Sequence, residues 1–259
     1  MSWDWQVFCE DTLEHQAVPG CFGKGGDITY LDWLLSAWGW TVSVSLLALA
    51  LALVLGAVIG TLRTLERRRV VVGLCNAWVE LFRNIPLLVQ MFLWYFVLPE
   101  VVPHAVGTWL KQLPDASFYN AVAALGFYTS ARVAEQVRSG IASMPRGQRL
   151  ASLALGLTLP QVYGYVLLPM AFRIILPPLT SEFLNIIKNS AVALTIGLME
   201  LTAQARSMSE FSFQVFEAFT AATVIYIIIN IVVTFAMRYV EGAVAVPGFI
   251  GTARPTAVH

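Results

Sequence analysis

The stretch MPRGQRLASLALGLTLPQVYGYVLLPMAFRIILPP, Met144–Pro178, decides the fold that this sequence predicts. It holds no charged residue between Arg149 and Arg173, which is typical of a helix that spans a membrane. It is also interrupted by residues that break helices, since proline removes a backbone donor and clashes with the preceding turn. These residues are Gly156, Pro160, Gly164 and Pro169. The stretch is therefore either an interrupted membrane span or a loop that contains a short helix.

The composition places the whole chain in the membrane class. Of its 259 residues, 58% are hydrophobic and 12% are charged, whereas soluble domains are about 45–50% apolar and about 25% charged. The formal net charge is zero, so no strongly basic or acidic partner is indicated. We therefore expect an all-α integral membrane protein, in which each span needs about 20 apolar residues.

Five segments are predicted to be spans, with residues 151–172 as a possible sixth. Residues 33–62, 116–131 and 218–237 are uncharged, and the second of these helices continues past Arg138. Another span is predicted to begin near Val70 and to end at Pro99. The remaining span is centred on residues 191–199 and extends back through Leu184.

The distribution of arginines favours five spans over six. Basic residues collect on the cytoplasmic side, so the loop at residues 63–69, with its four arginines, is predicted to be inside and the acidic residues 1–32 outside. If residues 151–172 do not cross, Arg173, Arg238 and Arg254 are inside as well. We thus predict an extracytoplasmic segment, a transmembrane domain with a cytoplasmic loop at about 144–172, and a cytoplasmic tail. Their bounds are 1–32, 33–245 and 246–259.

Residues 149–158 within this loop are predicted to form a short amphipathic helix. Leu150, Leu153, Ala154 and Leu157 follow the i, i+3, i+4, i+7 spacing of one helix face. Such a helix can dock into a groove on another protein or lie on the membrane surface. The spacing alone leaves both interpretations open.

Three motifs resemble those of a known family. Residues 150–169 resemble the E-A-A-x-x-x-G and I/V-x-L-P loop of ABC-importer permeases, with Gly156 and Pro169 in place but Leu150 where that loop has glutamate. VELFRNIPLLVQ (79–90) and AEQVRSGIASMPRGQ (134–148) resemble signatures of the polar amino acid (His/Glu/Gln-type) permeases. Over about residues 38–245 the chain is most similar to the glutamate/aspartate transport system permeases.

The resemblance implies the type I importer permease fold, with five transmembrane helices and a cytoplasmic coupling helix. It also implies a bacterial inner-membrane transport subunit rather than an enzyme, with its N-terminus outside and its C-terminus in the cytoplasm. No cofactor is expected in this chain, because a separate ATP-binding subunit binds ATP. The implied partners are a dimer of that subunit, a second permease in a heterodimer, and an extracytoplasmic substrate-binding protein that delivers glutamate or aspartate. The residues expected to contact the ATP-binding subunit are Gln148, Leu150, Ala151, Leu153, Gly156 and Leu157.

Polar residues in the predicted spans are candidates for the substrate pathway. A charge within the bilayer costs about 2.5–3.5 kcal/mol on insertion scales, so it needs a partner or a wet cavity. Arg132 could bind a substrate carboxylate or pair with Glu135, and Glu135 could instead form a structural ion pair with Arg138. Gln90 is expected to face the helix bundle. A further group of candidates comprises Lys188, Asn189 and Ser190. These side chains could line a polar path, although Lys188 could instead reach the cytoplasmic interface.

Other classes of function have little support in the sequence. GCFGKGGD (20–27) lacks the P-loop spacing, the three histidines are too scattered for a metal site, and no catalytic constellation is found. Two alternatives stay open. The chain could be a permease for another polar amino acid, such as glutamine or a basic one, or it could be an ion-coupled transporter with Glu135 as proton carrier. Cys9 and Cys21 are expected either to form a disulfide or to remain free thiols.

Overall fold

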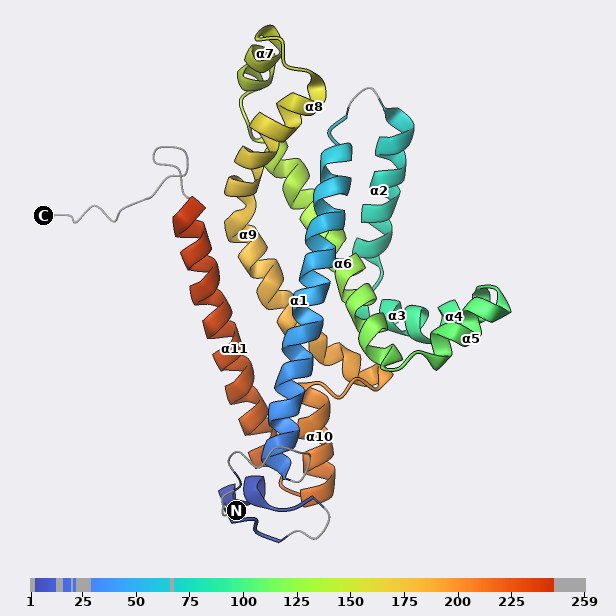
Figure 1. Ribbon diagram of the computed structural model, residues 1–259, viewed down its shortest axis with the longest axis vertical. Coiled ribbons are helices and arrows are strands. Elements are labelled where there is room, and N and C mark those ends of the chain that lie inside the picture. The colour runs from blue at the N-terminus through green and yellow to red at the C-terminus, as the bar shows by residue number, and fades with distance from the viewer. Residues whose placement is uncertain (1–2, 13–15, 20, 22–28, 66–67, 245–259) are drawn as a thin grey trace, which may run out of the picture.

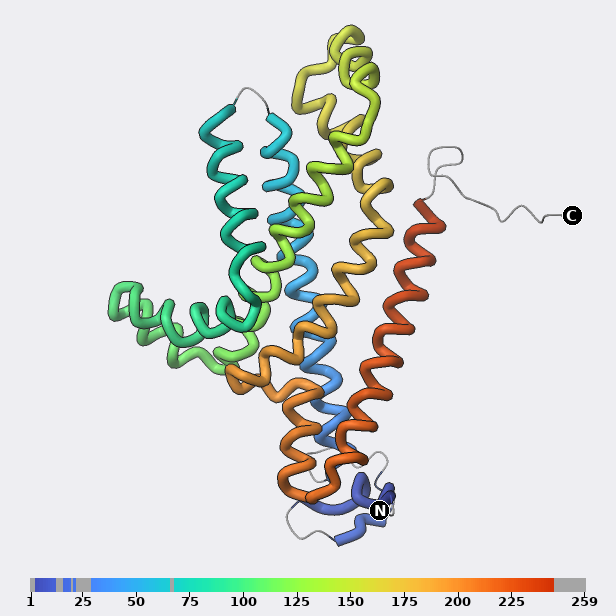
Figure 2. Tube along the Cα trace, turned by 180° about the vertical axis from the view of Figure 1, so that it is seen from behind, coloured from blue at the N-terminus to red at the C-terminus, as the bar shows by residue number. Residues whose placement is uncertain are grey.

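The computed structural model describes residues 3–12, 16–19, 21, 29–65 and 68–244, and every regular element within them is a helix. Four long helices form the body of the molecule (Figure 1): α1 (Tyr30–Leu62), α6 (Ala116–Ala142), α9 (Leu168–Asn189) and α11 (Val215–Val244). The N-terminus lies at one end of this body, and the short helix α7 (Arg146–Ala154) lies at the opposite end (Figures 1 and 2). The predicted tail at 246–259 falls outside the described residues.

Three helices in the described part of the chain are long and apolar enough to cross a membrane. They are Tyr30–Leu62, Leu159–Ile196 and Val215–Val244, and a bent pair that begins at Arg69 can count as a fourth. Helix α6 is not among them; it carries Arg132, Glu135 and Arg138 in its second half and polar residues such as Asn120 in its first half. The expected all-helical membrane class is therefore confirmed, whereas the number of five spans stays a prediction.

The second predicted span is not one helix, and the prediction of a single helix from Val70 to Pro99 was wrong. Helix α2 (Arg69–Asn84) ends before Pro86, and the chain then turns by 106° into α3 (Leu87–Phe92). A π-helical segment (Leu93–Val97), α4 (Leu98–Val101) and α5 (His104–Gln112) continue sideways from the body (Figure 1). The turn arises because a residue before proline is disfavoured in the helical conformation, and Ile85 is extended.

The fourth predicted span belongs to a longer helix, which begins well before Leu184 and includes residues 159–172 that were expected to lie in the loop. Thr158 caps α8 (Leu159–Gln161), and a π-helical segment (Val162–Leu167) leads directly into α9. A 3₁₀ segment (Ser190–Ile196) completes this helix of 38 residues. The region at about 144–172 is thus part loop and part long helix, and α7 alone is a separate short helix.

A π-helical segment precedes two of the prolines in these helices. Each segment ends two residues before a proline, at Val97 before Pro99 and at Leu167 before Pro169. A proline ring clashes with the carbonyl of residue i−4 in an α-helix, and that residue lies within the wider π turn in both cases. The helix therefore continues past Pro169 where the sequence predicts an interruption.

Close packing of α1 against α6 sets the register of the body. A Cβ atom added at Gly56 would lie 2.6 Å from the Cβ of Val133, and one added at Gly60 would lie 2.6 Å from the backbone oxygen of Ala134. Small residues four apart let helix backbones approach closely in membranes. This contact brings the C-terminal end of α1 beside Glu135.

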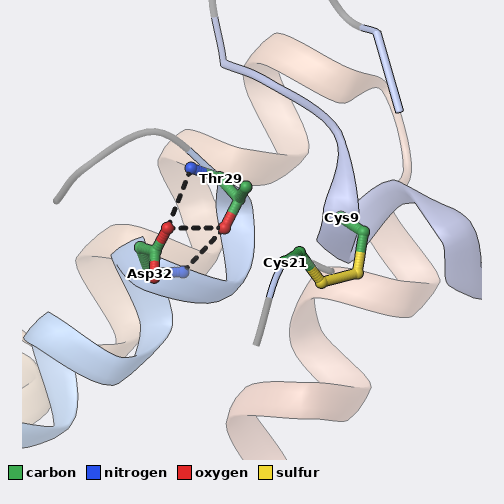
Figure 3. Close-up of a disulfide and its surroundings, with 4 residues drawn as sticks. All are labelled: Cys9, Cys21, Thr29 and Asp32. Atoms are coloured by element: carbon green, nitrogen blue, oxygen red, sulfur yellow. Dashed lines mark hydrogen bonds between the residues drawn. A yellow bond between two sulfur atoms is a disulfide. The ribbon is translucent and has the colours of Figure 1, made fainter. Parts of the chain in front are cut away.

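The N-terminal segment packs at the end opposite α7. Cys9 and Cys21 form a disulfide beside the start of α1, where Thr29 and Asp32 make a capping box (Figure 3). The backbone N–H of Asp4 donates to the buried carboxylate of Glu217 in α11, at 2.9 Å. The sequence left the cysteine pairing open, and the structure resolves it in favour of the disulfide.

Candidate functional site

The first candidate site is the exposed surface of α7. Leu150 and Leu155 are 65% and 83% exposed, and Ala151 is exposed between them, so these apolar side chains lie on the outer face of the molecule. Leu153 lines a groove that faces the end of α1, and Leu157 packs inward against the core. The apolar face predicted for residues 149–158 is therefore split, because α7 ends at Ala154 and the chain reverses. Leu155, which the periodicity did not select, is the most exposed of this group.

Gly156 terminates α7 in a left-handed conformation with φ of 84°. Its N–H donates to the oxygen of Leu153 at 3.0 Å, and the N–H of Leu157 donates to the oxygen of Ser152 at 3.2 Å. This is the Schellman arrangement, which favours glycine because a Cβ is strained there. Gln148 lies in the first turn of α7, and its backbone oxygen accepts a hydrogen bond from the hydroxyl of Ser152 at 2.8 Å. Within this chain, Gly156 sets where the helix stops.

The second candidate site is an ion cluster around Glu135 on α6. Its Oε2 accepts from Arg63 Nη1 at 2.7 Å, and its Oε1 accepts from Arg138 Nε at 3.1 Å. The Nε of Arg63 also donates to the side-chain oxygen of Asn76 in α2, at 2.7 Å. The pairing with Arg138 was one of the predicted alternatives, whereas Arg63 was predicted only as a loop residue. The cluster ties α1, α2 and α6 together at the end of the molecule that carries α7.

The third candidate site is Arg132, which does not pair with Glu135. Its Nη1 donates to Oε2 of Glu182 in α9 at 3.3 Å, and its guanidinium lies 5.4 Å from the ring centre of Tyr128. Gln136, one turn along α6, donates to the other oxygen of Glu182 at 3.2 Å. The side chain of Arg132 is 40% exposed, and that of Glu182 is 12% exposed. A partly exposed guanidinium thus meets a carboxylate on the facing helix, which sequence reasoning missed.

Gln90 is buried at the break between α2 and α3. Its Nε2 donates to the oxygens of Phe82 and Ile85, at 3.0 and 2.9 Å. Both amide hydrogens are therefore used on carbonyls that the bend leaves without helical partners. The prediction that Gln90 faces the interior agrees with this position, and the contacts give it a structural role.

The remaining candidates diverge at the C-terminal end of α9. Lys188 is exposed, Asn189 is half-buried, and the hydroxyl of buried Ser190 donates to the oxygen of Ile187 at 2.7 Å. This end of α9 lies away from α7 (Figure 1). Both interpretations of Lys188, a polar path and a position at the cytoplasmic interface, stay predictions. In this position the lysine complements the negative end of the helix dipole.

Sequence reasoning missed Arg63 and Glu182 because their partners are far along the chain. Arg63 lies 72 residues from Glu135, and Glu182 lies 50 residues from Arg132. The signal that could have found the first pair is the Gly56-x-x-x-Gly60 spacing, which places a close helix contact one turn before Arg63. Glu182 is the only acidic residue of the mostly apolar helix α9, and a charged residue in such a helix requires a partner.

Known proteins of similar sequence are amino acid permeases. The chain is 44% identical over 254 residues, which is 97% of this chain and 98% of the relative, to the glutamate/aspartate import permease protein GltJ of Escherichia coli (strain K12). It is 34% identical to the probable amino-acid ABC transporter permease protein PatM of Vibrio harveyi, over 84% of this chain and 96% of the relative. It is 33% identical to the glutamine transport system permease protein GlnP of E. coli (strain K12), over 78% of this chain and 88% of the relative.

Solved structures and a family profile agree with these relatives. A chain of the crystal structure of an amino acid ABC transporter with histidines superposes with a TM-score of 0.70, at 28% identity over 83% of this chain and 95% of that chain. A chain of the inward-facing MetNI methionine ABC transporter is 21% identical and shares the fold with a TM-score of 0.68, over 83% of this chain and 98% of that chain. Residues 52–246 match one family profile, and the chain belongs to that family, the binding-protein-dependent transport system inner membrane components.

Proposed function

We propose that this chain is the permease subunit of an ATP-driven importer that carries glutamate and aspartate across the bacterial inner membrane. The observation that carries the proposal is the 44% identity to a glutamate/aspartate import permease over nearly the whole length of both chains. The identity to a glutamine permease is lower and covers less of this chain, which disfavours glutamine as the substrate.

The proposed arrangement places the α7 end in the cytoplasm and the disulfide-bonded N-terminal segment outside. Basic residues of the α1–α2 turn and of α7 gather at one end, which supports this orientation. With α2–α4 and the ion-paired α6 counted as spans, the membrane domain has the five helices that the sequence predicts. A substrate-binding protein would then meet the N-terminal end, and a second permease would complete the pathway beside this chain.

The ATP-binding subunits would dock on α7. Exposed Leu150, Ala151 and Leu155 offer an apolar surface on a helix held apart from the body, which fits a groove on a partner. Gly156 fixes the angle at which α7 leaves the long helix of Leu159–Ile196. Movement of the docked subunits would therefore pull directly on that helix, which carries Glu182.

Arg132 and Glu182 suit the translocation of an acidic amino acid. Arg132 is partly exposed, and at rest its charge is balanced by Glu182 at 3.3 Å. A carboxylate of the substrate would replace Glu182 as the partner of the guanidinium, which can bind carboxylates with two parallel hydrogen bonds. Glu135 has a structural role in this proposal, because the guanidiniums of Arg63 and Arg138 both bind its carboxylate. An ion-coupled mechanism with Glu135 as proton carrier is disfavoured for the same reason.

The test of the proposed function is uptake into vesicles. The chain is purified with its co-purifying subunits, reconstituted with ATP inside, and supplied with radiolabelled glutamate and the binding protein outside. We expect ATP-dependent accumulation that unlabelled aspartate suppresses and unlabelled glutamine does not. Uptake driven by an ion gradient without ATP, or stronger suppression by glutamine than by aspartate, would contradict the proposal.

Replacement of Arg132 by glutamine is expected to lower glutamate uptake. Hydrogen bonds to charged groups contribute about 1.5–3 kcal/mol, so we expect glutamate uptake, measured per inserted chain, to fall roughly 10- to 100-fold. The matched control is Lys111→Gln, because Lys111 forms an exposed ion pair with Glu100 far from α9. Equal uptake by the two variants, with the binding protein's affinity for glutamate unchanged, would remove Arg132 from the pathway.

A further inference from the structure

A cavity of about 330 Å³ lies beneath α7, and arginines from three helices line it. Arg63 comes from the end of α1, Arg138 from α6, and Arg146 and Arg149 from α7. The hydroxyl-bearing residues Thr64 and Tyr163 also line the cavity, and their hydroxyl oxygens lie 2.8 Å apart. The cavity thus offers hydrogen-bond donors and positive charge to an anion.

The side-chain hydrogen bonds of Arg63 and Arg138 leave some of the donors of these two residues available. A guanidinium has five N–H groups. The side-chain hydrogen bonds described above use Nε and Nη1 of Arg63 and leave its Nη2 group for a ligand. Arg138 uses Nε and Nη2, and both of these bonds go to Oε1 of Glu135. Two guanidiniums therefore share the single negative charge of Glu135, which leaves a net positive charge at this wall before Arg146 is counted.

The start of α7 adds to the same field. The helix has nine residues, Pro145 precedes it, and no side chain caps its first turn. Pro145 and Arg146 both line the cavity. Backbone N–H groups at a helix N-terminus carry partial positive charge and favour phosphate groups.

An apolar groove adjoins the cavity and shares Arg149 and Tyr163 with it. The groove has a volume of about 790 Å³ and runs between the end of α1, the start of α2 and α8. Its apolar lining consists of Leu62, Leu65, Val71, Leu153, Leu159 and Pro160. A basic cavity that continues into an apolar groove matches the two parts of a phospholipid, the charged headgroup and the acyl chain.

We propose that this cavity binds the headgroup phosphate of an anionic phospholipid, with an acyl chain along the adjoining groove. Basic pockets between helices on the cytoplasmic side of membrane proteins bind such headgroups. The inference rests on the proposed function only in placing the α7 end at the cytoplasmic leaflet. A lipid bound there contacts both α7 and α1, so it would hold α7 in its position relative to the body.

The test is native mass spectrometry of the full chain in detergent, with phosphatidylglycerol as the anionic probe and phosphatidylethanolamine as the zwitterionic one. We expect preferential retention of phosphatidylglycerol. Arg146→Gln is expected to weaken it about fivefold and Arg146→Glu roughly 30-fold, because each charge contributes about 1 kcal/mol. The control is Arg206→Gln, since Arg206 is an exposed arginine of α10 (Leu201–Ser212) at the opposite end of the molecule. Thermal unfolding of each variant shows that it is folded.

Three results would overturn the proposal. Equal retention of the two lipids by the unchanged chain would show that the cavity does not select the anionic headgroup. If Arg206→Gln reduces the retention of phosphatidylglycerol as much as Arg146→Gln does, the lipid binds outside this cavity. Displacement of phosphatidylglycerol by inorganic phosphate would identify free phosphate as the ligand. All three are read without ATP or transport, so they are independent of the uptake test.

Discussion

Replacement of Gly156 by valine is expected to lower ATP-driven uptake roughly 5- to 30-fold while the chain still inserts into the membrane. The physical reason is the left-handed φ of 84° at this position, which costs an L-residue roughly 1–2 kcal/mol and a β-branched residue more. A penalty of that size shifts a local equilibrium by the same factor of 5–30. The Schellman turn would open, and α7 would leave the orientation in which Leu150 and Leu155 face outward. Uptake per inserted chain is the measurement.

The matched control for this prediction is Gly164→Val. At both glycines an added Cβ would meet no atom within 4 Å, so steric crowding is equal. Gly164 lies in the π-helical segment Val162–Leu167, and its φ is not positive. We expect nearly normal uptake from this control. If Gly156→Val transports as well as Gly164→Val, the orientation of α7 does not govern coupling.

Replacement of Glu135 by glutamine is expected to destabilise the folded chain by about 3 kcal/mol. Removal of one partner from a buried ion pair costs about 3–5 kcal/mol, and the lower end applies because the Glu135 side chain is 29% exposed. Glutamine preserves the volume but leaves Arg63 and Arg138 as adjacent positive charges without their counter-charge. The contacts that tie α1 and α2 to α6 would weaken together.

Cys75 provides a direct measurement of this effect. It is a buried free thiol on α2, next to Asn76, and the other two cysteines form the disulfide. A dye that becomes fluorescent on reaction with thiols therefore reports the temperature at which α2 separates from the body. The control is Glu100→Gln, which removes an exposed ion pair with Lys111 that contributes about 0–1 kcal/mol. An equal unfolding temperature for the two variants would show that the Glu135 cluster is not structural.

The family was predictable from the sequence alone. The spacing of Gly156 and Pro169, and the motifs around Glu80 and Glu135, identified an importer permease, and the relatives confirm it. The family is defined by a transport-system component, so the prediction of a transport subunit rather than an enzyme also agrees with it. These inferences succeeded because the motifs are local, and a local pattern is read directly from residue order.

Predictions of continuous helices were less successful. Pro86 was expected inside one long span and instead turns the chain by 106°, whereas Pro169 was expected in a loop and lies within a long helix. The same residue type therefore had opposite outcomes. The difference is that a π turn precedes Pro169 and receives its ring, and Gln90 binds the carbonyls that the turn at Pro86 exposes. Neither compensation is visible in hydropathy.

The sequence by itself determined the membrane class, the family, and a short helix predicted at residues 149–158, which the structure places at Arg146–Ala154. It also selected the charged residues of α6 as important, because isolated charges in an apolar helix need partners. Only the tertiary structure decided which partners they have. Glu135 binds Arg63 because Gly56 and Gly60 let α1 approach α6 closely, and Arg132 binds Glu182 because α9 also packs against α6. Helix contacts of this kind depend on the fit of whole surfaces. A local spacing such as that of Gly56 and Gly60 indicates a close contact but does not specify which helix makes it.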